Sequence, residues 1–268
     1  MKKKFKLGVI GAGFMATAII QGVLRQGVIA PSDIIVSDVN DVALDKMNKL
    51  GVNVIKDNFI LANNAEYVLF AVKPQMISDV LTGIKGATCN KFISIMAGIK
   101  KERLKNAFPD AKIARCMPNT PCAIGSGAVG IDFSDFDSEN DVKFISDLFN
   151  PLAVTVAVDE NMLNVVTGIS GSSPAYFYLF LKGVIEAGVR RGLTEEQATL
   201  LATKTMIGAG NMVLSNRDKS IDELINAVCS KGGTTIEAVK TYKENGLSEI
   251  TEKAIDACVK RSEELENI

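Results

Sequence analysis

The segment Leu7–Ala16 points most directly to a chemistry, because a short apolar run ends there in the pattern G-x-G-x-x-A. Gly11 permits a tight turn out of a strand, and Gly13 has no side chain to hold a diphosphate away from the backbone. Ala16 is small enough for the next helix to pack on the strand, and the free N–H groups of that helix attract phosphates. Further strand–helix units follow, so the pattern predicts dinucleotide binding rather than an ordinary turn.

Two more motifs follow strand-like runs, at the edge of a parallel sheet where ligands bind. The first is A-V-K-P at 71–74, which puts the cation of Lys73 at the mouth of the crevice, although most lysines at strand ends are simply solvated. The second is M-P-N-T-P at 117–121, whose two prolines hold the loop extended and leave Asn119 and Thr120 to form hydrogen bonds. A rigid connector explains this second motif equally well.

A third motif, S-K-G-G-T-T at 230–235, precedes a helix. Two glycines, hydroxyls on both sides and a helix N-terminus form a set of N–H donors that suits a small carboxylate. A well-capped turn between helices explains the hydroxyls but does not require two adjacent glycines. The motif therefore favours a second anion site.

The composition restricts the chemistry further. The chain of 268 residues has no histidine, which removes the commonest general base and metal ligand, so no metal site is expected. The formal charge of −1 gives no electrostatic attraction to nucleic acid or acidic membranes. The odd number of cysteines, five, favours reduced thiols. Glycines interrupt the only signal-like start, and no apolar run approaches the roughly 20 residues of a membrane span, so we expect a cytoplasmic protein.

The elements that position these motifs alternate between strand and helix in the first part of the chain. Strand-like runs lie near 6–10, 34–37, 52–55, 66–72, 91–95, 112–116 and 152–158, and helical runs near 14–26, 41–50, 58–63, 75–84, 100–107 and 138–148. After residue 159 only helical signals remain, with starts at Ser173-Pro174, Thr194, Ser220 and Thr234. We therefore predict an α/β Rossmann-type parallel-sheet domain over 1–160 and an all-helical domain over 161–268.

The helix predicted over 175–191 is apolar on all sides rather than along one stripe. Such a helix is buried all round, and a domain of about 105 residues does this with difficulty alone. Gly208 and Gly210 in the next helix permit a close helix crossing, either within the chain or with a partner. Together these features favour an intertwined homodimer.

The motifs together resemble the pyrroline-5-carboxylate reductase family over essentially the whole chain. The resemblance rests on G-x-G-x-x-A at 11–16, A-V-K-P at 71–74, M-P-N-T-P at 117–121, S-G-S-S-P-A-Y at 170–176 and S-x-G-G-T-T at 230–235. It implies hydride transfer from NADPH or NADH to the imine carbon of 1-pyrroline-5-carboxylate, which gives L-proline. It also implies a homodimer joined through the helical domain, and in some members a larger ring of dimers.

The resemblance also implies roles for individual residues. The turn that holds the substrate carboxylate contains Ser230, Gly232, Gly233, Thr234 and Thr235. Thr235 and Lys73 are the candidate catalytic residues, and Thr235 could hydrogen-bond the ring nitrogen as it becomes an amine. The candidate cofactor-binding residues are Gly11, Ala12, Gly13, Phe14, Met15, Ser37, Asp38, Asn40, Asn58, Ala71, Val72, Lys73, Pro74, Ala97 and Asn119.

The choice between the two cofactors stays open in the sequence. An acidic residue after the second strand normally binds the ribose 2′-hydroxyl and disfavours a 2′-phosphate. Asp38, however, lies one residue beyond the usual position, so that Ser37 or Asn40 could face the ribose instead. The nearest cation is Lys46, and the position that often carries arginine in NADPH-dependent members is not basic.

Two other functions deserve comparison. A β-hydroxyacid dehydrogenase has the same domain order but needs a catalytic lysine early in its helical domain, where this chain has no lysine before Lys182. A nucleotide-sensing regulator without catalysis has no need for the second anion site at 230–235. Both alternatives therefore fit the sequence less well than the reductase.

Overall fold

The computed structural model describes residues 4–266 and divides the chain into two compact units. The first unit contains the described residues up to Ser172 together with those from Cys258 onward, and the second is Ser173–Ala257. The expected boundary near residue 160 therefore lies inside the first unit. The reason is that the segment after residue 160 packs against the sheet and that the end of the chain returns to this unit.

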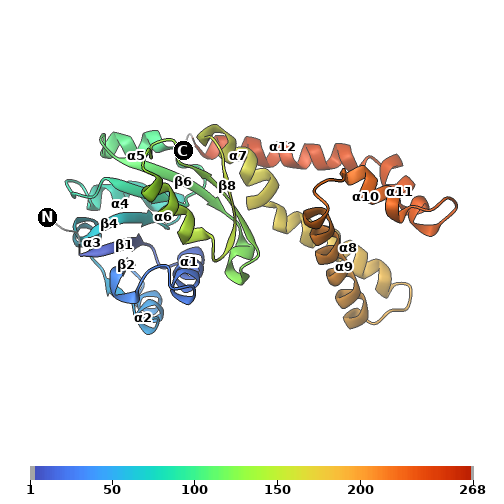
Figure 1. The fold of residues 1–268 in the computed structure, drawn as a ribbon, viewed down its shortest axis with the longest axis horizontal. Helices are drawn as coiled ribbons and strands as arrows, with labels where there is room; N and C mark the ends of the chain where they lie inside the picture. The colour runs from blue at the N-terminus through green and yellow to red at the C-terminus, as the bar shows by residue number, and fades with distance from the viewer. Residues whose placement is uncertain (1–3, 267–268) are drawn as a thin grey trace. The chain divides into compact units, whose positions relative to one another are not determined.

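The first unit is built around an eight-stranded sheet in the order β3-β2-β1-β4-β5-β6-β7-β8 (Figure 1). The strands are β1 (Phe5–Ile10), β2 (Ile34–Ser37), β3 (Asn53–Ile55), β4 (Ala65–Phe70), β5 (Lys91–Ser94), β6 (Lys112–Pro118), β7 (Gly127–Asp132) and β8 (Ala153–Ala157). The first six strands are parallel, whereas β7 is antiparallel to β6 and parallel to β8. The expected Rossmann-type fold is thus confirmed, with β1 between β2 and β4.

The strand β7 is absent from the sequence prediction. Its sequence, G-A-V-G-I-D, contains two glycines, which usually weaken a strand. In the structure the glycines permit close packing, because a Cβ at Gly130 would lie 2.8 Å from Cγ1 of Val166. The strand therefore depends on contacts with a segment far along the chain, which no local pattern reveals.

Two layers of helices cover the faces of the sheet. One apolar core lies beneath α1 (Phe14–Arg25), α2 (Asp41–Lys49) and α6 (Glu139–Phe149). A second core lies beneath α3 (Asn58–Asn64), α4 (Ile77–Gly83) and α5 (Lys101–Ala107). Short 3₁₀ turns occur at Pro31–Asp33, Pro74–Met76, Thr120–Ile124 and Glu160–Met162, and α7 (Leu163–Val166) continues into a π turn at Thr167–Gly171. Because both faces are covered, the central strands are largely buried; in β4 only Glu66, near its start, is half-buried.

The second unit consists of α8 (Ser173–Val189), α9 (Glu195–Ser215), α10 (Ile221–Val228), α11 (Thr234–Glu244) and the first part of α12 (Leu247–Leu265). The predicted helix starts at Thr194 and Ser220 are confirmed, and each is a capping box: Thr194 with Gln197 opens α9, and Ser220 with Glu223 opens α10. Gly192 and Gly246, which precede α9 and α12, adopt positive φ angles of 103° and 70°. None of the described helices is long and apolar enough to cross a membrane.

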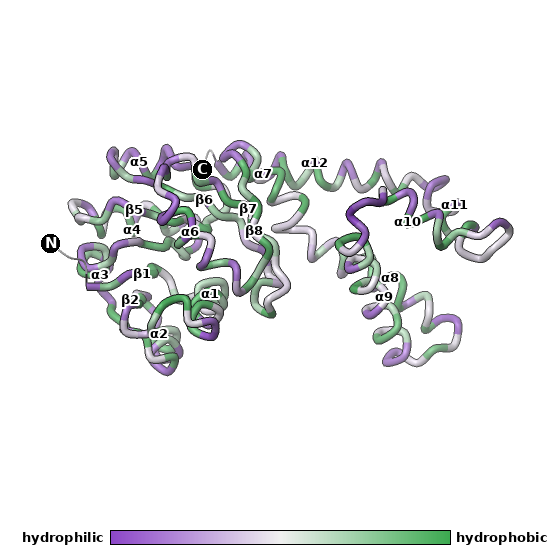
Figure 2. Tube along the Cα trace, in the orientation of Figure 1, coloured by the Kyte–Doolittle hydropathy of each residue, from purple (hydrophilic) through white to green (hydrophobic). Residues whose placement is uncertain are grey.

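The second unit has almost no core of its own. Ser173 and Ala198 are its only buried residues, whereas Leu179 on α8 is 73% exposed and Leu214 on α9 is 64% exposed. Figure 2 shows the hydrophobic colour along much of both helices. The prediction that α8 is apolar all round is confirmed. In a single chain, however, this apolar surface faces solvent.

Buried polar contacts hold the end of the chain to the first unit. Arg115 on β6 has a side chain only 4% exposed, and its guanidinium lies 2.9 Å from a Glu160 carboxylate oxygen and 3.5 Å from one of Glu266. Ser262 on α12 donates a hydrogen bond of 2.6 Å to Oδ1 of Asn164, and both residues are buried. Because an unpaired buried guanidinium is costly, these contacts make the chain end part of the fold.

A second polar cluster joins three elements on the first unit. The hydroxyl of Tyr67 on β4 and the ammonium of Lys91 on β5 both donate to Asp141 on α6, the latter at 2.7 Å. Burial acts to raise the pKa of Asp141, but the hydrogen bonds from Lys91 and Tyr67 outweigh it and hold the pKa below its usual value. Since the pKa is lower in the folded state, the charged carboxylate stabilises the fold at neutral pH.

We expect Asp141→Asn to lower the free energy of unfolding at pH 7 by about 1.5–3 kcal/mol, the range for hydrogen bonds to a charged group. The difference from the wild type should shrink as the pH falls from the usual aspartate pKa of about 3.9 through the lower pKa of the folded state, because the unfolded chain then takes up a proton before the folded carboxylate does. Urea unfolding of both proteins at pH 7 and at a pH below about 3.9 measures the two free energies of unfolding. Asp147→Asn on the same helix affects only exposed hydrogen bonds, with Lys143 and Asn150, and should change little. Equal losses in both variants would contradict this role of Asp141.

Candidate functional site

The turn after β1 is shaped by the close approach of β4. Gly11 has a positive φ of 100°, and a Cβ there would lie only 2.7 Å from the carbonyl oxygen of Ala71. The Gly11 N–H donates to the carbonyl of Ser37 at 2.8 Å, and the Ala71 N–H donates to that of Ile10 at 2.9 Å. Only glycine fits this position. The turn lies where the strand order changes direction, which is where ligands bind in such sheets.

The start of α1 is open in the way that a diphosphate requires. A Cβ at Gly13 would meet no atom within 4 Å, so the space beside this backbone is free. Gly13 is the N-cap of α1, and no side chain accepts a hydrogen bond from the first N–H groups of the helix. The Thr17 hydroxyl instead donates to the Gly13 carbonyl at 2.8 Å. Unsatisfied N–H groups and open space together fit the diphosphate of a dinucleotide.

A cavity of about 560 Å³, here called the strand-end cavity, adjoins this turn. It collects nine of the residues named from the sequence, namely Gly11, Gly13, Ser37, Asp38, Asn40, Asn58, Ala71, Val72 and Lys73. It also contains Val39, Lys56, Met76, Asp79 and Val80, which the sequence analysis does not name. Met76 and Val80 lie one turn apart just after Pro74, so the helical spacing beyond A-V-K-P is the signal that could have identified them.

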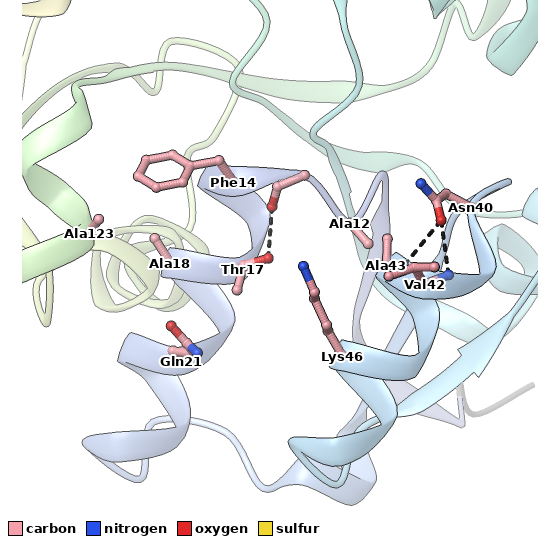
Figure 3. A pocket seen from close by; sticks show the side chains of 11 residues that line it. Ala12, Phe14, Thr17, Ala18, Gln21, Asn40, Val42, Ala43, Lys46 and Ala123 are labelled. Carbon is pink, nitrogen blue, oxygen red and sulfur yellow. Dashed lines mark hydrogen bonds between the residues drawn. The ribbon is translucent and has the colours of Figure 1, made fainter.

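A second cavity of about 450 Å³, the helix-pair cavity, lies between α1 and α2 (Figure 3). It is lined by Ala12, Gly13, Phe14 and Asn40, which were predicted, and by Thr17 and Lys46, which were not. Lys46 points from α2 into the space between the two helices, and Asn40 caps α2 by accepting from the N–H groups of Val42 and Ala43 (Figure 3). The two cavities share Gly13 and Asn40.

Hydrogen bonds order the polar residues that follow β2. The buried hydroxyl of Ser37 donates to Oδ1 of Asn58 at 2.6 Å. Oδ2 of Asp38 accepts from the Ala12 N–H at 2.7 Å, and Oδ1 accepts from the Asn40 N–H at 2.8 Å. The Asp38 carboxylate therefore joins the glycine turn to the start of α2.

Lys73, in contrast, is exposed, and its ammonium forms no hydrogen bond or ion pair with the described residues. It precedes Pro74, which begins the 3₁₀ turn Pro74–Met76. The ammonium is therefore free to contact a ligand at the strand-end cavity, which it lines. Met15, Pro74, Ala97 and Asn119 line neither the strand-end cavity nor the helix-pair cavity.

The side chain of Asn119 has several partners within the protein. Its Oδ1 accepts from the Ala128 N–H at 3.0 Å, and its Nδ2 lies 3.3 Å from Oγ of Ser170 and 3.4 Å from the carbonyl oxygen of the same residue. These bonds connect the loop after β6 with β7 and with the π turn. The structure thus gives this residue a role in holding three segments together, in addition to any contact with a cofactor.

The turn at 230–235 belongs to the second unit. Gly232 has a positive φ of 74°, and a Cβ at Gly233 would collide with the Ser230 hydroxyl. Gly233 is the N-cap of α11, and no side chain caps the first N–H groups of that helix. The hydroxyls of Thr234 and Thr235 form no hydrogen bonds with the described residues. Backbone donors and free hydroxyls are thus available to an anion, as the motif predicts.

The cysteines beside the M-P-N-T-P motif, Cys116 and Cys122, are buried thiols. All five cysteines are free thiols. Burial raises the pKa of Cys116, and also that of Cys122 in the loop after β6, so both stay protonated. No group of three or more potential metal ligands occurs among residues 4–266. Hydroxyls, backbone N–H groups, the Asp38 carboxylate and Lys73 are among the groups at these motifs that can contact ligands.

Comparisons with known proteins agree over both units. A family model for pyrroline-5-carboxylate reductase dimerisation matches residues 160–265, and one for NADP oxidoreductase, coenzyme F420-dependent, matches 6–98. The pyrroline-5-carboxylate reductase of Haemophilus influenzae is 39% identical over 266 residues, which is 98% of each chain. The structure of the Coxiella burnetii enzyme has a TM-score of 0.89 at 32% identity, covering 98% of this chain and 99% of that one. The Plasmodium falciparum enzyme, solved with NADP bound, has a TM-score of 0.86 at 27% identity, covering 99% and 100%.

The similarity covers both units and extends over nearly the full length of each relative. A relative with more than 30% identity over this length establishes common descent and a common fold. The chain therefore belongs to the pyrroline-5-carboxylate reductase family.

Proposed function

We propose that this protein reduces 1-pyrroline-5-carboxylate to L-proline with NADH or NADPH, as the last step of proline biosynthesis. The observation that carries the proposal is that one chain of this family contains two uncapped helix N-termini, each preceded by glycines that open the backbone. The start of α1 suits a diphosphate, and the start of α11 suits a small carboxylate. A dinucleotide and a carboxylated substrate are the two reactants of this oxidoreductase.

The residues of the second unit hold the substrate. The N–H groups at the start of α11 bind its carboxylate, with Ser230, Thr234 and Thr235 adding hydroxyl donors. A cyclic imine is readily protonated, so the ring is already an electrophile and needs little acid catalysis. Thr235 hydrogen-bonds the ring nitrogen as the imine becomes an amine. This suits a chain without histidine, because the protein has to position the reactants rather than move protons.

The residues of the first unit hold the cofactor. The open backbone at Gly13 and the N–H groups of α1 bind its diphosphate, and the strand-end cavity takes the adjoining groups. Lys73, at the carboxyl end of β4, provides a positive charge to the bound molecule. When bound, the reduced nicotinamide supplies the hydride that completes the imine reduction.

The active form is proposed to be a homodimer joined by α8 and α9. The family model for dimerisation matches the helical residues. The large apolar surface of these helices is exposed in a single chain, and a surface of this kind is typical of a protein–protein interface. A larger ring of dimers and a cytoplasmic location remain predictions from the sequence.

When the protein, reduced cofactor and 1-pyrroline-5-carboxylate are mixed, we expect the absorbance of the reduced nicotinamide to fall. One molecule of proline should form for each molecule of cofactor oxidised. Omitting the imine should stop the consumption. A protein that binds the cofactor without turnover would support a sensor, and turnover of a β-hydroxyacid instead would support the dehydrogenase alternative.

The carboxylate turn is tested by Thr235→Ala. We expect KM for the imine to rise and kcat to fall, with a combined loss of about 1.5–3 kcal/mol in kcat/KM, because one hydrogen bond to a charged group disappears. The Kd of the cofactor should stay unchanged. Thr241→Ala is the matched control, since this hydroxyl lies later in α11 and bonds only the Glu237 carbonyl. An unchanged kcat/KM in Thr235→Ala would place the carboxylate elsewhere.

The dimer is tested by Phe180→Glu, which places a charge in the apolar surface of α8. Because interfaces of this kind bury more than about 2,000 Å² and behave like a core, we expect insoluble or unfolded protein rather than a stable monomer. Lys182→Glu alters the charge of the same helix at a residue already 71% exposed and should remain dimeric. Light scattering that finds an active wild-type monomer at low micromolar concentration would contradict the proposal.

A further inference from the structure

Asp38 occupies a place that the sequence alone could not assign. It follows β2 directly, and its carboxylate accepts from the N–H of Ala12, inside the G-x-G-x-x-A turn, at 2.7 Å. The other oxygen accepts from the N–H of Asn40 at 2.8 Å. Two backbone donors on opposite sides therefore hold the carboxylate at the wall of the strand-end cavity, next to the turn that suits the diphosphate.

The carboxylate still has acceptor capacity in this position. An ionised carboxylate has about four acceptor sites and no donor, and the two backbone N–H groups occupy only half of them. The remaining sites can accept from the hydroxyls of a ribose. A 2′-phosphate presents oxygen acceptors with about −1.5 to −2 charges, so it has nothing to donate and is repelled by Asp38.

The neighbouring residues do not compensate for this repulsion. Val39, the next residue, is apolar and 81% exposed, where an arginine would provide a fork for a phosphate. Lys56 lines the strand-end cavity, but its ammonium already pairs with a carboxylate oxygen of Asp41 at 2.6 Å. The Ser37 hydroxyl is used by Asn58. Lys73 lines the same cavity but follows β4, which lies on the other side of β1 from the strand that leads to Asp38. Lys46 lines the helix-pair cavity instead (Figure 3).

We infer that Asp38 binds the adenosine ribose and makes NADH the preferred cofactor of this protein. The inference rests on the proposed use of a nicotinamide dinucleotide and adds the residue that discriminates between its two forms. The relative from Plasmodium falciparum was solved with NADP bound, so the family fold accommodates a 2′-phosphate. The preference must therefore come from local residues of this chain.

Equilibrium titration of the purified protein with NADH and NADPH measures the preference without any substrate. We expect the wild type to bind NADH at least about tenfold more tightly than NADPH, a ratio equivalent to about 1.4 kcal/mol. Asp38→Asn keeps an oxygen acceptor but loses the charge, and the ratio should fall to about threefold or less. Adding Val39→Arg to Asp38→Asn should reverse the preference.

Asp45→Asn is the matched control, because it removes the same charge from an exposed position on α2 that lines neither cavity and has no ion-pair partner among the described residues. It should keep the wild-type ratio. If Asp38→Asn fails to fold, competition on the wild type between ADP-ribose and its 2′-phosphate decides instead, and ADP-ribose should bind about tenfold better. Wild-type protein that binds NADPH as tightly as NADH, or more tightly, would overturn the inference, and loss of such NADPH binding in Lys46→Gln would assign the phosphate to that lysine.

The outcomes also separate this inference from the proposed function. Imine reduction with a preference for NADPH contradicts the role of Asp38 alone. Tight, selective NADH binding without imine reduction contradicts the proposed reaction and supports the role of Asp38.

Discussion

The close approach of β1 and β4 at their carboxyl ends is the constraint on which the cofactor site depends. The Ala71 N–H reaches the Ile10 carbonyl at 2.9 Å, which leaves no room for a side chain at Gly11. The backbone must therefore turn sharply, and α1 begins at once with its first N–H groups uncapped. An anion-binding helix end is thus a direct result of strand packing, and the open space at Gly13 makes it accessible.

The same turn is held from its other side by β2. The Gly11 N–H bonds the Ser37 carbonyl, and the Ala12 N–H bonds the carboxylate of the next residue, Asp38. The residue that we propose to bind the ribose is in this way also part of the scaffold that shapes the glycine turn. Binding and support are combined in one side chain, which is possible because a carboxylate accepts more hydrogen bonds than the backbone uses.

The second unit follows a different principle. Its helices begin and end through local signals, such as the capping boxes at Thr194 and Ser220, but two residues alone are buried within its bounds. Local capping defines where helices start, whereas apolar burial supplies most of the stability of a fold. Under the proposed dimer, that burial comes from a second copy of the chain. The carboxylate turn at 230–235 then lies in a unit whose rigidity depends on assembly.

The sequence by itself determined the features that arise from neighbouring residues. These features depend on the types and spacing of residues only a few positions apart, so local sequence patterns predict them. They are the glycine turn, seven of the eight strands, the helix starts and the glycine-rich turn at 230–235. Other features arise only in the tertiary structure. They are the strand β7, the hydrogen bonds of Asn119 with Ala128 and Ser170, the ion pair of Glu266 with Arg115 and the hydrogen bond from the Ala12 N–H to Asp38. Each of these joins groups that are distant in sequence or on separate elements, and their energies exist only once the sheet has brought them into contact.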